Sequence, residues 1–227
     1  MKKIYRSITT AIIATVLLSV SSCKQLDVIG KESKTSFGEV LTARSGAIGV
    51  DAVTGGWTLP APDGSAAFVW VPDFSKGTTR DVMLVFDIRP FLAAGLDVNR
   101  LPDSITVLND KIIVGTKLGD EEAAYTGEPT PLSSFERIVD LKRSSIGYHA
   151  ALDHYGVDLT GGFMFEWAKD MNTNDKDIVF VLNPEPFIAA GVDPAKIDGW
   201  VFTTVPTMDS KGRKIEVEKI LKPVNLL

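Results

Sequence analysis

An internal repeat is the feature of this sequence that most limits its possible folds. The segment from Pro90 to Asp97 (Pro-Phe-Leu-Ala-Ala-Gly-Leu-Asp) returns 96 residues later, from Pro186 to Asp193, as Pro-Phe-Ile-Ala-Ala-Gly-Val-Asp, and six of the eight residues are identical. Such a match indicates a duplicated unit whose two copies pack on one another. The sequence therefore predicts two tandem repeats, at residues 36–132 and 133–227.

Both repeats carry the pattern of buried strands. Trp70 and Trp167 occupy equivalent positions in apolar segments, and each is followed by a continuous apolar run, at residues 82–86 and 178–182. A short continuous apolar run is typical of a strand that is buried on both faces. We therefore expect a central buried strand in each repeat.

Each repeated octapeptide predicts one very short helix. Pro90 and Pro186 suit the first helical position, where no backbone N–H is needed, and Gly95 and Gly191 suit the left-handed residue that ends a helix. No stretch keeps a helical period over more than about three turns. The sequence therefore predicts a mainly β protein with about five antiparallel strands and one short helix in each repeat. An α+β fold is the alternative if the helices are longer.

Two further segments complete the predicted repeat. The residues from Phe37 to Gly49, and those from Phe135 to Tyr148, are expected to be extended. Near the end of the chain, residues 200–205 and 215–220 are expected to form a hairpin. The apolar and polar alternation of its second strand breaks at Lys219. This break predicts an edge strand or a bulge.

The first 22 residues have the pattern of a bacterial lipoprotein signal peptide. Three basic residues precede an apolar stretch that is too short to span a bilayer. The motif Val20-Ser21-Ser22-Cys23 then resembles a lipobox, at which the peptide is cut before a cysteine that carries acyl chains. The resemblance implies that Cys23 is the lipid attachment site and that residues 23–35 form a lipidated tether. An ordinary signal peptide beside an unrelated cysteine is the alternative.

The residue after Cys23 bears on the expected location. Lys24 stands where an aspartate would resemble an inner-membrane retention signal, so we expect an outer-membrane lipoprotein that faces the periplasm or the cell surface. Removal of the leader, with its three basic residues, takes the formal net charge from −5 to −8. Nucleic acids and anionic lipid surfaces both require a basic footprint, so neither is an expected partner.

No group of residues predicts catalysis or metal binding. The segment from Asp170 to Asp177 begins like a calcium loop but lacks the required glycine and the bidentate glutamate. His149 and His154, five residues apart, are expected on opposite faces of a strand. No Gly-x-Ser-x-Gly motif is present to expose a nucleophile. We therefore expect a protein that is not an enzyme, with no catalytic residue, metal or cofactor.

Four aromatic residues are the candidates for ligand binding. Trp57 and Trp200 have no tryptophan at the equivalent place in the other repeat, and Tyr148 and Tyr155 lie in a segment that differs between the repeats. If exposed, these rings would suit a sugar or an apolar ligand. Packing in the core is the competing interpretation.

The lipobox and the duplicated Pro-Phe-x-Ala-Ala-Gly-x-Asp unit together resemble small two-repeat lipoproteins of Gram-negative bacteria, several of which are described as lipid-binding. The resemblance assigns no catalytic residue. It implies a membrane-anchored binding protein that holds a lipid or another apolar molecule between two pseudo-symmetric repeats. The alternatives are a component of a cell-envelope uptake or assembly system, which binds a glycan or a partner protein, and a structural spacer.

Overall fold

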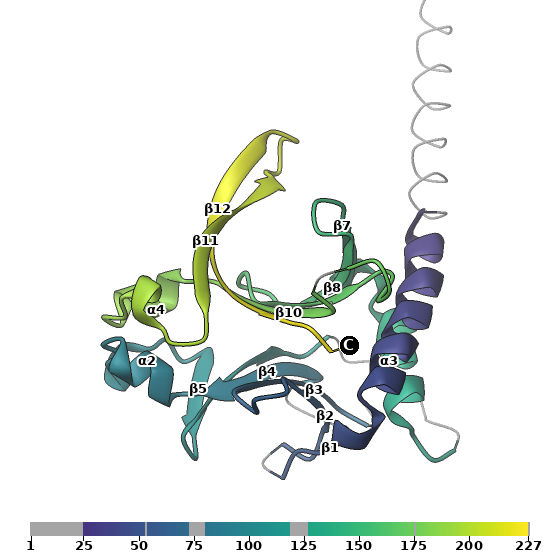
Figure 1. Cartoon of the computed structure of the whole chain (residues 1–227), viewed down its shortest axis with the longest axis horizontal. Coiled ribbons are helices and arrows are strands. Elements are labelled where there is room, and N and C mark those ends of the chain that lie inside the picture. Colours follow the sequence, from purple (N-terminus) through teal and green to yellow (C-terminus); the bar gives the residue numbers. More distant parts are fainter. Residues whose placement is uncertain (1–24, 53, 73–79, 119–126, 175, 227) are drawn as a thin grey trace, which may run out of the picture.

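The chain forms two six-stranded antiparallel sheets that pack face to face (Figure 1). The computed structural model describes residues 25–52, 54–72, 80–118, 127–174 and 176–226. The strand order is β1-β2-β3-β4-β6-β5 in the first sheet and, from the matching edge, β7-β8-β9-β10-β12-β11 in the second. The two orders coincide when the repeats are aligned. The predicted mainly β fold with two tandem repeats is thus confirmed, with six strands in each repeat rather than about five.

The strands of the first sheet are β1 (Gly49–Val50), β2 (Trp57–Pro60), β3 (Ala66–Trp70), β4 (Val82–Asp87), β5 (Ile105–Leu108) and β6 (Lys111–Thr116). Those of the second are β7 (Ile146–His149), β8 (His154–Asp158), β9 (Met164–Ala168), β10 (Ile178–Leu182), β11 (Val201–Met208) and β12 (Lys214–Val224). Short 3₁₀ turns cover Ser45–Ala47, Val98–Arg100, Arg143–Ser145 and Pro194–Lys196. The predicted C-terminal hairpin is confirmed as β11 and β12.

The predicted central strands are also confirmed. Every residue of β4 and of β10 is buried. In β4, Leu84 and Phe86 point into the main core, whereas Met83 and Val85 belong to a second apolar cluster on the opposite face of the sheet. A strand covered on both faces has no polar side to expose, and this explains its continuous apolar run.

The repeated octapeptide forms the predicted short helices, α2 (Arg89–Ala93) and α4 (Glu185–Ala189), each with proline in its first turn. The glycines that follow have positive φ angles, 107° at Gly95 and 96° at Gly191. They also meet each other, because a Cβ atom on Gly95 would lie 2.8 Å from the carbonyl oxygen of Gly191. Both the left-handed backbone and the close approach therefore require glycine.

The two octapeptides hydrogen-bond each other reciprocally. The backbone N–H of Asp97 donates to the carbonyl of Ala190 at 2.8 Å, and the N–H of Asp193 donates to the carbonyl of Ala94 at 2.9 Å. This pair of bonds marks the pseudo-two-fold axis between the repeats. A residue near this axis contacts the equivalent residue of the other repeat. A substitution at one such position therefore changes a contact that both repeats share. This accounts for the near identity of the two octapeptides.

The segments that are expected to be extended at the start of each repeat are instead largely helical. The N-terminal helix covers residues 25–43, and α3 covers Pro131–Leu141. Thr130 begins α3 with a capping box. The buried side chains Phe135, Ile138 and Val139 then recur at helical spacing along one face. The expectation of extended chain is wrong because this short run fits a helical period as well as an extended one.

The N-terminal helix includes residues 25–35, most of the stretch that the lipobox assigns to the tether. Its buried face carries two small polar residues, Ser33 and Ser36, next to Phe37 and Val40. Because these serines are polar, they interrupt the helical spacing of apolar residues by which a helix is normally recognised in a sequence. The boundary between tether and first repeat stays a prediction.

Each long helix hydrogen-bonds to the sheet of the other repeat. Trp70 Nε1, on β3, donates to Ser134 Oγ on α3 at 2.8 Å, and Trp167 Nε1, on β9, donates to Ser36 Oγ on the N-terminal helix at 2.9 Å. The rings of Phe37 and Phe135 stack between them with centroids 3.7 Å apart. The two repeats therefore share one continuous core.

The two serines offer a matched pair of mutations. We expect Ser36→Ala to lower the free energy of unfolding by about 1–3 kcal/mol, because it removes the hydrogen-bond acceptor of the buried Trp167 N–H. Ser134→Ala should cost less, because Trp70 Nε1 also contacts the carbonyl oxygen of Pro131 at 3.1 Å. Urea unfolding of both variants measures the difference, and equal losses would contradict it.

Candidate functional site

The second sheet curls into a trough. The first sheet does not form one, because its corresponding strands are shorter. Strands β11 and β12 have eight and eleven residues, whereas their counterparts β5 and β6 have four and six. The long hairpin bends toward the β7–β8 hairpin at the opposite edge of the same sheet (Figure 1). Between them, on the face turned away from the first sheet, lies a pocket of about 320 Å³. We call this pocket the trough.

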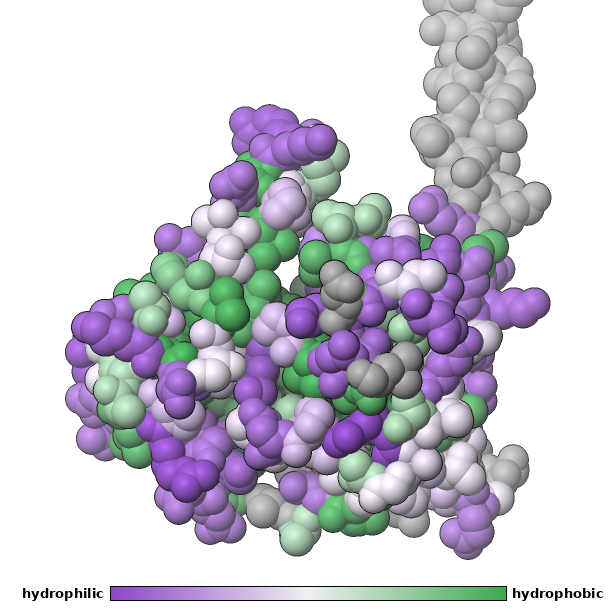
Figure 2. Space-filling view, in the orientation of Figure 1, coloured by the Kyte–Doolittle hydropathy of each residue, from purple (hydrophilic) through white to green (hydrophobic). Residues whose placement is uncertain are grey.

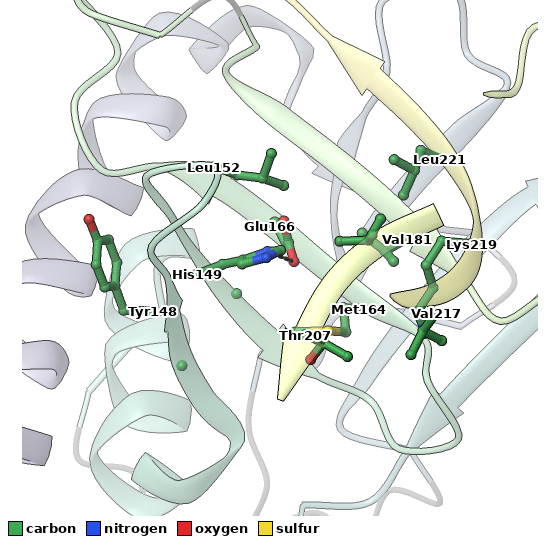
Figure 3. Close-up of a pocket in the computed structure, with 13 residues that line it drawn as sticks. Tyr148, His149, Leu152, Met164, Glu166, Val181, Thr207, Val217, Lys219 and Leu221 are labelled. Atoms are coloured by element: carbon green, nitrogen blue, oxygen red, sulfur yellow. Dashed lines mark hydrogen bonds and ion pairs between the residues drawn. The ribbon is translucent and has the colours of Figure 1, made fainter. Parts of the chain in front are cut away.

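The walls of the trough are mostly apolar. Six apolar side chains line it: Leu152, Met164, Val181, Val205, Val217 and Leu221. Figure 2 shows apolar residues along the inner side of the β11–β12 hairpin and hydrophilic residues at its tip. The polar side chains of the trough are His149, Glu166, Thr207 and Lys219 (Figure 3). An apolar pocket with a few polar groups is the usual form of a small-molecule site.

Two glycines keep one wall of the trough open. Gly147 on β7 and Gly156 on β8 are directly opposite each other in the strand register. A Cβ atom on Gly156 would lie 3.1 Å from Cγ of Glu166, whereas one on Gly147 would meet no heavy atom within 4 Å. The space beside Gly147 therefore belongs to the trough and would accept a side chain.

A buried carboxylate and two imidazoles form the polar part of the trough. Glu166 Oε1 lies 3.3 Å from Nδ1 of His149, and Glu166 Oε2 lies 3.7 Å from Nδ1 of His154. The side chain of Glu166 is only 3% exposed. A carboxylate with so little contact with water is costly unless it is paired, so this cluster holds the floor of the trough in place.

A single hydrogen bond shows which ring nitrogen of His154 carries a hydrogen. Its Nε2 atom lies 2.9 Å from the carbonyl oxygen of Lys176, which can only accept, so Nε2 carries a hydrogen. In a neutral ring Nδ1 is then an acceptor, and it faces Oε2 of Glu166, another acceptor. Both atoms are buried and neither has a hydrogen-bond partner. At 3.7 Å these two atoms are also too far apart for a hydrogen bond.

His149 connects the β7 edge of the curled sheet to its floor. From β7 it hydrogen-bonds Glu166 on β9, and the backbone of Pro206 on β11 makes a smaller contribution to its pKa. The hydrogen bond with Glu166 is the main cause that raises the pKa of His149 above its ordinary value. Burial would raise the pKa of Glu166, but the hydrogen bond from His149 and the nearby His154 outweigh burial and lower it. The His149–Glu166 pair is therefore favoured in its charged form.

Lys219 lies on the wall formed by β12. It is half-buried, and burial lowers its pKa below the ordinary value. In the strand order β12 lies between β10 and β11, and its pairing with β11 runs through Lys219 without a bulge. The expectation of a bulge is therefore wrong. The pairing with β10 begins only at Ile220, so at Lys219 the strand is paired on one side, as expected of an edge. The alternation breaks at Lys219 because this residue lines the trough with Val217 and Leu221, while Ile220 packs into the main core.

The expectation that the two histidines lie on opposite faces of one strand is also wrong. His149 ends β7 and His154 begins β8, and the two residues are opposite each other in the strand register. The turn between them includes Asp153, which has a positive φ of 53°. Cross-strand neighbours share a face of the sheet, so both rings reach Glu166.

The aromatic candidates lie mostly outside the trough. Tyr155 and Trp200 are 1% and 8% exposed and belong to the core, and Trp57, partly buried, packs against it. Trp57 and Tyr155 are at equivalent positions, because each is the cross-strand partner of the tryptophan that both repeats share, Trp70 or Trp167. The hydroxyl of Tyr155 donates to Glu32 on the N-terminal helix.

Tyr148 is the one aromatic candidate that borders the trough. Figure 3 shows its ring pointing away from His149. On that other side the Tyr148 hydroxyl donates to Asp153 at 2.5 Å, and the ring lies 5.5 Å from that of Tyr155. Cys23 lies outside the described residues.

Glu166 and Lys219 were not among the candidate residues, although each leaves a signal in the sequence. Glu166 interrupts the apolar segment before Trp167, where the first repeat has Val69 before Trp70. A charge at a buried position in one copy of a repeat indicates a role that the other copy lacks.

No group of three or more His, Cys, Asp or Glu side chains suited to a metal ion occurs in the described part of the chain.

Comparisons with known proteins add no functional assignment. No protein-family model, no curated protein and no solved structure matches this chain. Within the described ranges, no helix has both the length and the apolar composition to cross a bilayer. The trough is therefore the feature from which function has to be inferred.

Proposed function

We propose that this protein is a membrane-anchored, non-enzymatic binding lipoprotein that holds a lipid-like or other apolar small molecule in the trough of its second sheet. The observation that carries the proposal is a pocket with apolar walls, built by strands that are longer in one repeat than in the other. Its volume of about 320 Å³ is at the lower end for ligand pockets. It suits one medium-length chain of about a dozen non-hydrogen atoms better than a two-chain phospholipid.

The trough, rather than the space between the repeats, is the proposed site. The facing sides of the two sheets are filled by aromatic rings, such as Phe68 and Phe165, whose centroids are 4.3 Å apart. Trp200 lies 5.6 Å from Phe86 in the same core. A ligand there would have to displace packed core side chains, which is costly.

The position of the N-terminal helix supports a membrane source for the ligand. In Figure 1 the first described turn of this helix lies on the same side of the molecule as β7 and the tip of the β11–β12 hairpin, the two elements that flank the trough. Exposed apolar side chains stand at both rims of the trough: Leu152 on the β7–β8 turn, and Met208 and Ile215 near the tip of the β11–β12 hairpin. If Cys23 is acylated, as the lipobox implies, the trough would open toward the leaflet of the outer membrane that holds the acyl chains.

The aromatic side chains favour an apolar ligand over a glycan. A glycan site needs exposed rings on a shallow polar surface, but Trp200 and Tyr155 are buried. Tyr148 is exposed, yet it is hydrogen-bonded to Asp153 outside the trough. We therefore rank a glycan-binding role second.

Gly147→Leu should block the trough. The new side chain would enter open space beside the apolar walls, and the backbone at Gly147 is not in the left-handed region. We expect binding of an uncharged apolar probe to weaken at least about tenfold, the loss expected when a pocket contact is replaced by a clash. The measurement is photolabelling of the acylated chain in lipid nanodiscs with a diazirine derivative of decanol, followed by peptide mapping.

The matched control is Gly49→Leu, the same change at the equivalent position of the first repeat. A Cβ atom there would lie 3.9 Å from the nearest heavy atom, on Thr58, so the fold should tolerate it equally well. Labelling of β7 to β12 peptides should persist in this control. If wild-type labelling is spread over the whole chain, or is unchanged by Gly147→Leu, the trough is not the binding site.

A further inference from the structure

Lys219 is the one trough-lining residue whose charge is not paired within the described structure. Its ammonium group donates to the carbonyl oxygen of Gly162 at 3.1 Å. Among the described residues no carboxylate forms an ion pair with it, and Asp158, Glu185 and Glu166 act on it only through longer-range electrostatics. The other charges of the trough, on His149 and Glu166, satisfy each other.

An ammonium group inside an apolar wall has a cost that a ligand can remove. Lys219 lies between Val217 and Leu221 on the same face of β12, and Val181 of β10 is the cross-strand partner of Leu221. Burial among these side chains disfavours the charged amine and lowers its pKa. An anion placed beside the ammonium group would compensate for this, whereas a neutral or cationic group would not.

We infer that the ligand of the trough is an anionic amphiphile, with a carboxylate or phosphate group bound by Lys219 and a single apolar chain lying along Val181, Val217 and Leu221. This inference rests on the proposed function, because it names the chemical class that the same trough would select. The recognition is local to one lysine and is compatible with the net negative charge of the chain.

The position of Glu166 agrees with this orientation of the ligand. Its carboxylate is buried under His149 and His154, so the negative charge at the floor is balanced by the hydrogen-bonded imidazole. An anionic head group is therefore expected at the Lys219 side of the trough and not beside Glu166. The same arrangement would disfavour a ligand with a cationic group near Lys219.

The test compares two photoreactive probes of equal chain length, the diazirine derivatives of decanoic acid and of decanol. The acylated chain is labelled in nanodiscs at about pH 8, where the carboxyl group is ionised. Labelling of the trough peptides is normalised to labelling of the surrounding lipid. We expect the acid to label these peptides about tenfold more than the alcohol, as a charge-assisted hydrogen bond at a half-buried site implies. Lys219→Met should remove the preference and leave labelling by the alcohol unchanged.

The control is Lys111→Met, because Lys111 is the equivalent residue of the first repeat and lies outside the trough. It should keep the preference for the acid. Equal trough labelling by acid and alcohol in the wild type would overturn the inference while leaving the proposed function in place. Absence of trough labelling by the alcohol as well as the acid would overturn both. If Lys111→Met lost the preference for the acid to the same degree as Lys219→Met, the loss of any positive charge, and not of Lys219 in particular, would explain the result.

Discussion

Replacing Phe37 with alanine is expected to lower the free energy of unfolding by about 3–5 kcal/mol, and to destabilise both repeats together. Phe37 is fully buried, and its ring stacks on Phe135 of the other repeat with centroids 3.7 Å apart. It also meets Trp167 at 5.3 Å and Trp70 at 5.6 Å. The cavity left by the ring would be lined by both repeats, so neither repeat could close it alone.

Urea unfolding gives the loss, and amide hydrogen exchange shows where it falls. Protection should decrease in β4 and in β10, the buried central strands of the two sheets. Leu92→Ala is the control, because Leu92 is 47% exposed on α2 and should change stability by less than about 0.5 kcal/mol. If β10 kept its full protection while β4 lost it, the two repeats would be independent domains and not one shared core.

Much of this fold follows from local patterns in the sequence. The central strands were predictable because a run such as Val82 to Phe86 has no polar side, and the structure buries both of its faces. The short helices were predictable because Pro90 and Gly95 act on the backbone directly, whatever surrounds them. The turn at Asn109-Asp110 likewise follows from residues that tolerate positive φ angles, 49° and 58°.

The remaining features depend on contacts between distant residues. Ser36 looks like a surface residue in the sequence, but it is buried, and its hydroxyl accepts a hydrogen bond from Trp167 of the other repeat. His149, His154 and Glu166 come from three strands, and their meeting depends on the register of the β7–β8 hairpin. The break at Lys219 was visible, but its meaning requires knowing that β12 is an interior strand of a curled sheet. Long-range register of this kind leaves no local periodic signal.

The charged cluster on the floor of the trough gives the second large prediction. Glu166→Ala should lower the free energy of unfolding by about 2–3 kcal/mol near pH 6, because it removes the hydrogen-bond acceptor of the charged His149 imidazole. The effect should be below that of a fully enclosed ion pair, since the side chain of His149 is 26% exposed and its imidazole can lose its proton. A larger effect would mean that His149 cannot lose its charge in the folded state.

The pH dependence of stability identifies the pair. His149 has a folded-state pKa raised mainly by its hydrogen bond with Glu166, so its contribution is complete below the ordinary value of about 6.5 and is lost as pH rises through the raised pKa. Glu166 has a lowered pKa, so its contribution is complete above about 4.5 and is lost as pH falls through the lowered pKa. The pair should therefore stabilise the protein most between about pH 4.5 and 6.5.

Glu166→Gln keeps the shape of the side chain and removes its charge. The free energy of unfolding of this variant should therefore change less than that of the wild type as pH rises above about 6.5. The matched control is Val69→Ala, at the equivalent position of the first repeat, where the side chain is fully buried and no charge is involved. This control should lose stability by the same amount at every pH, because it removes only packing. Urea unfolding at a series of pH values distinguishes the variants. If wild type and Glu166→Gln lose stability in parallel above about pH 6.5, then the β7 edge of the trough is not joined to its floor by a charged His149–Glu166 pair.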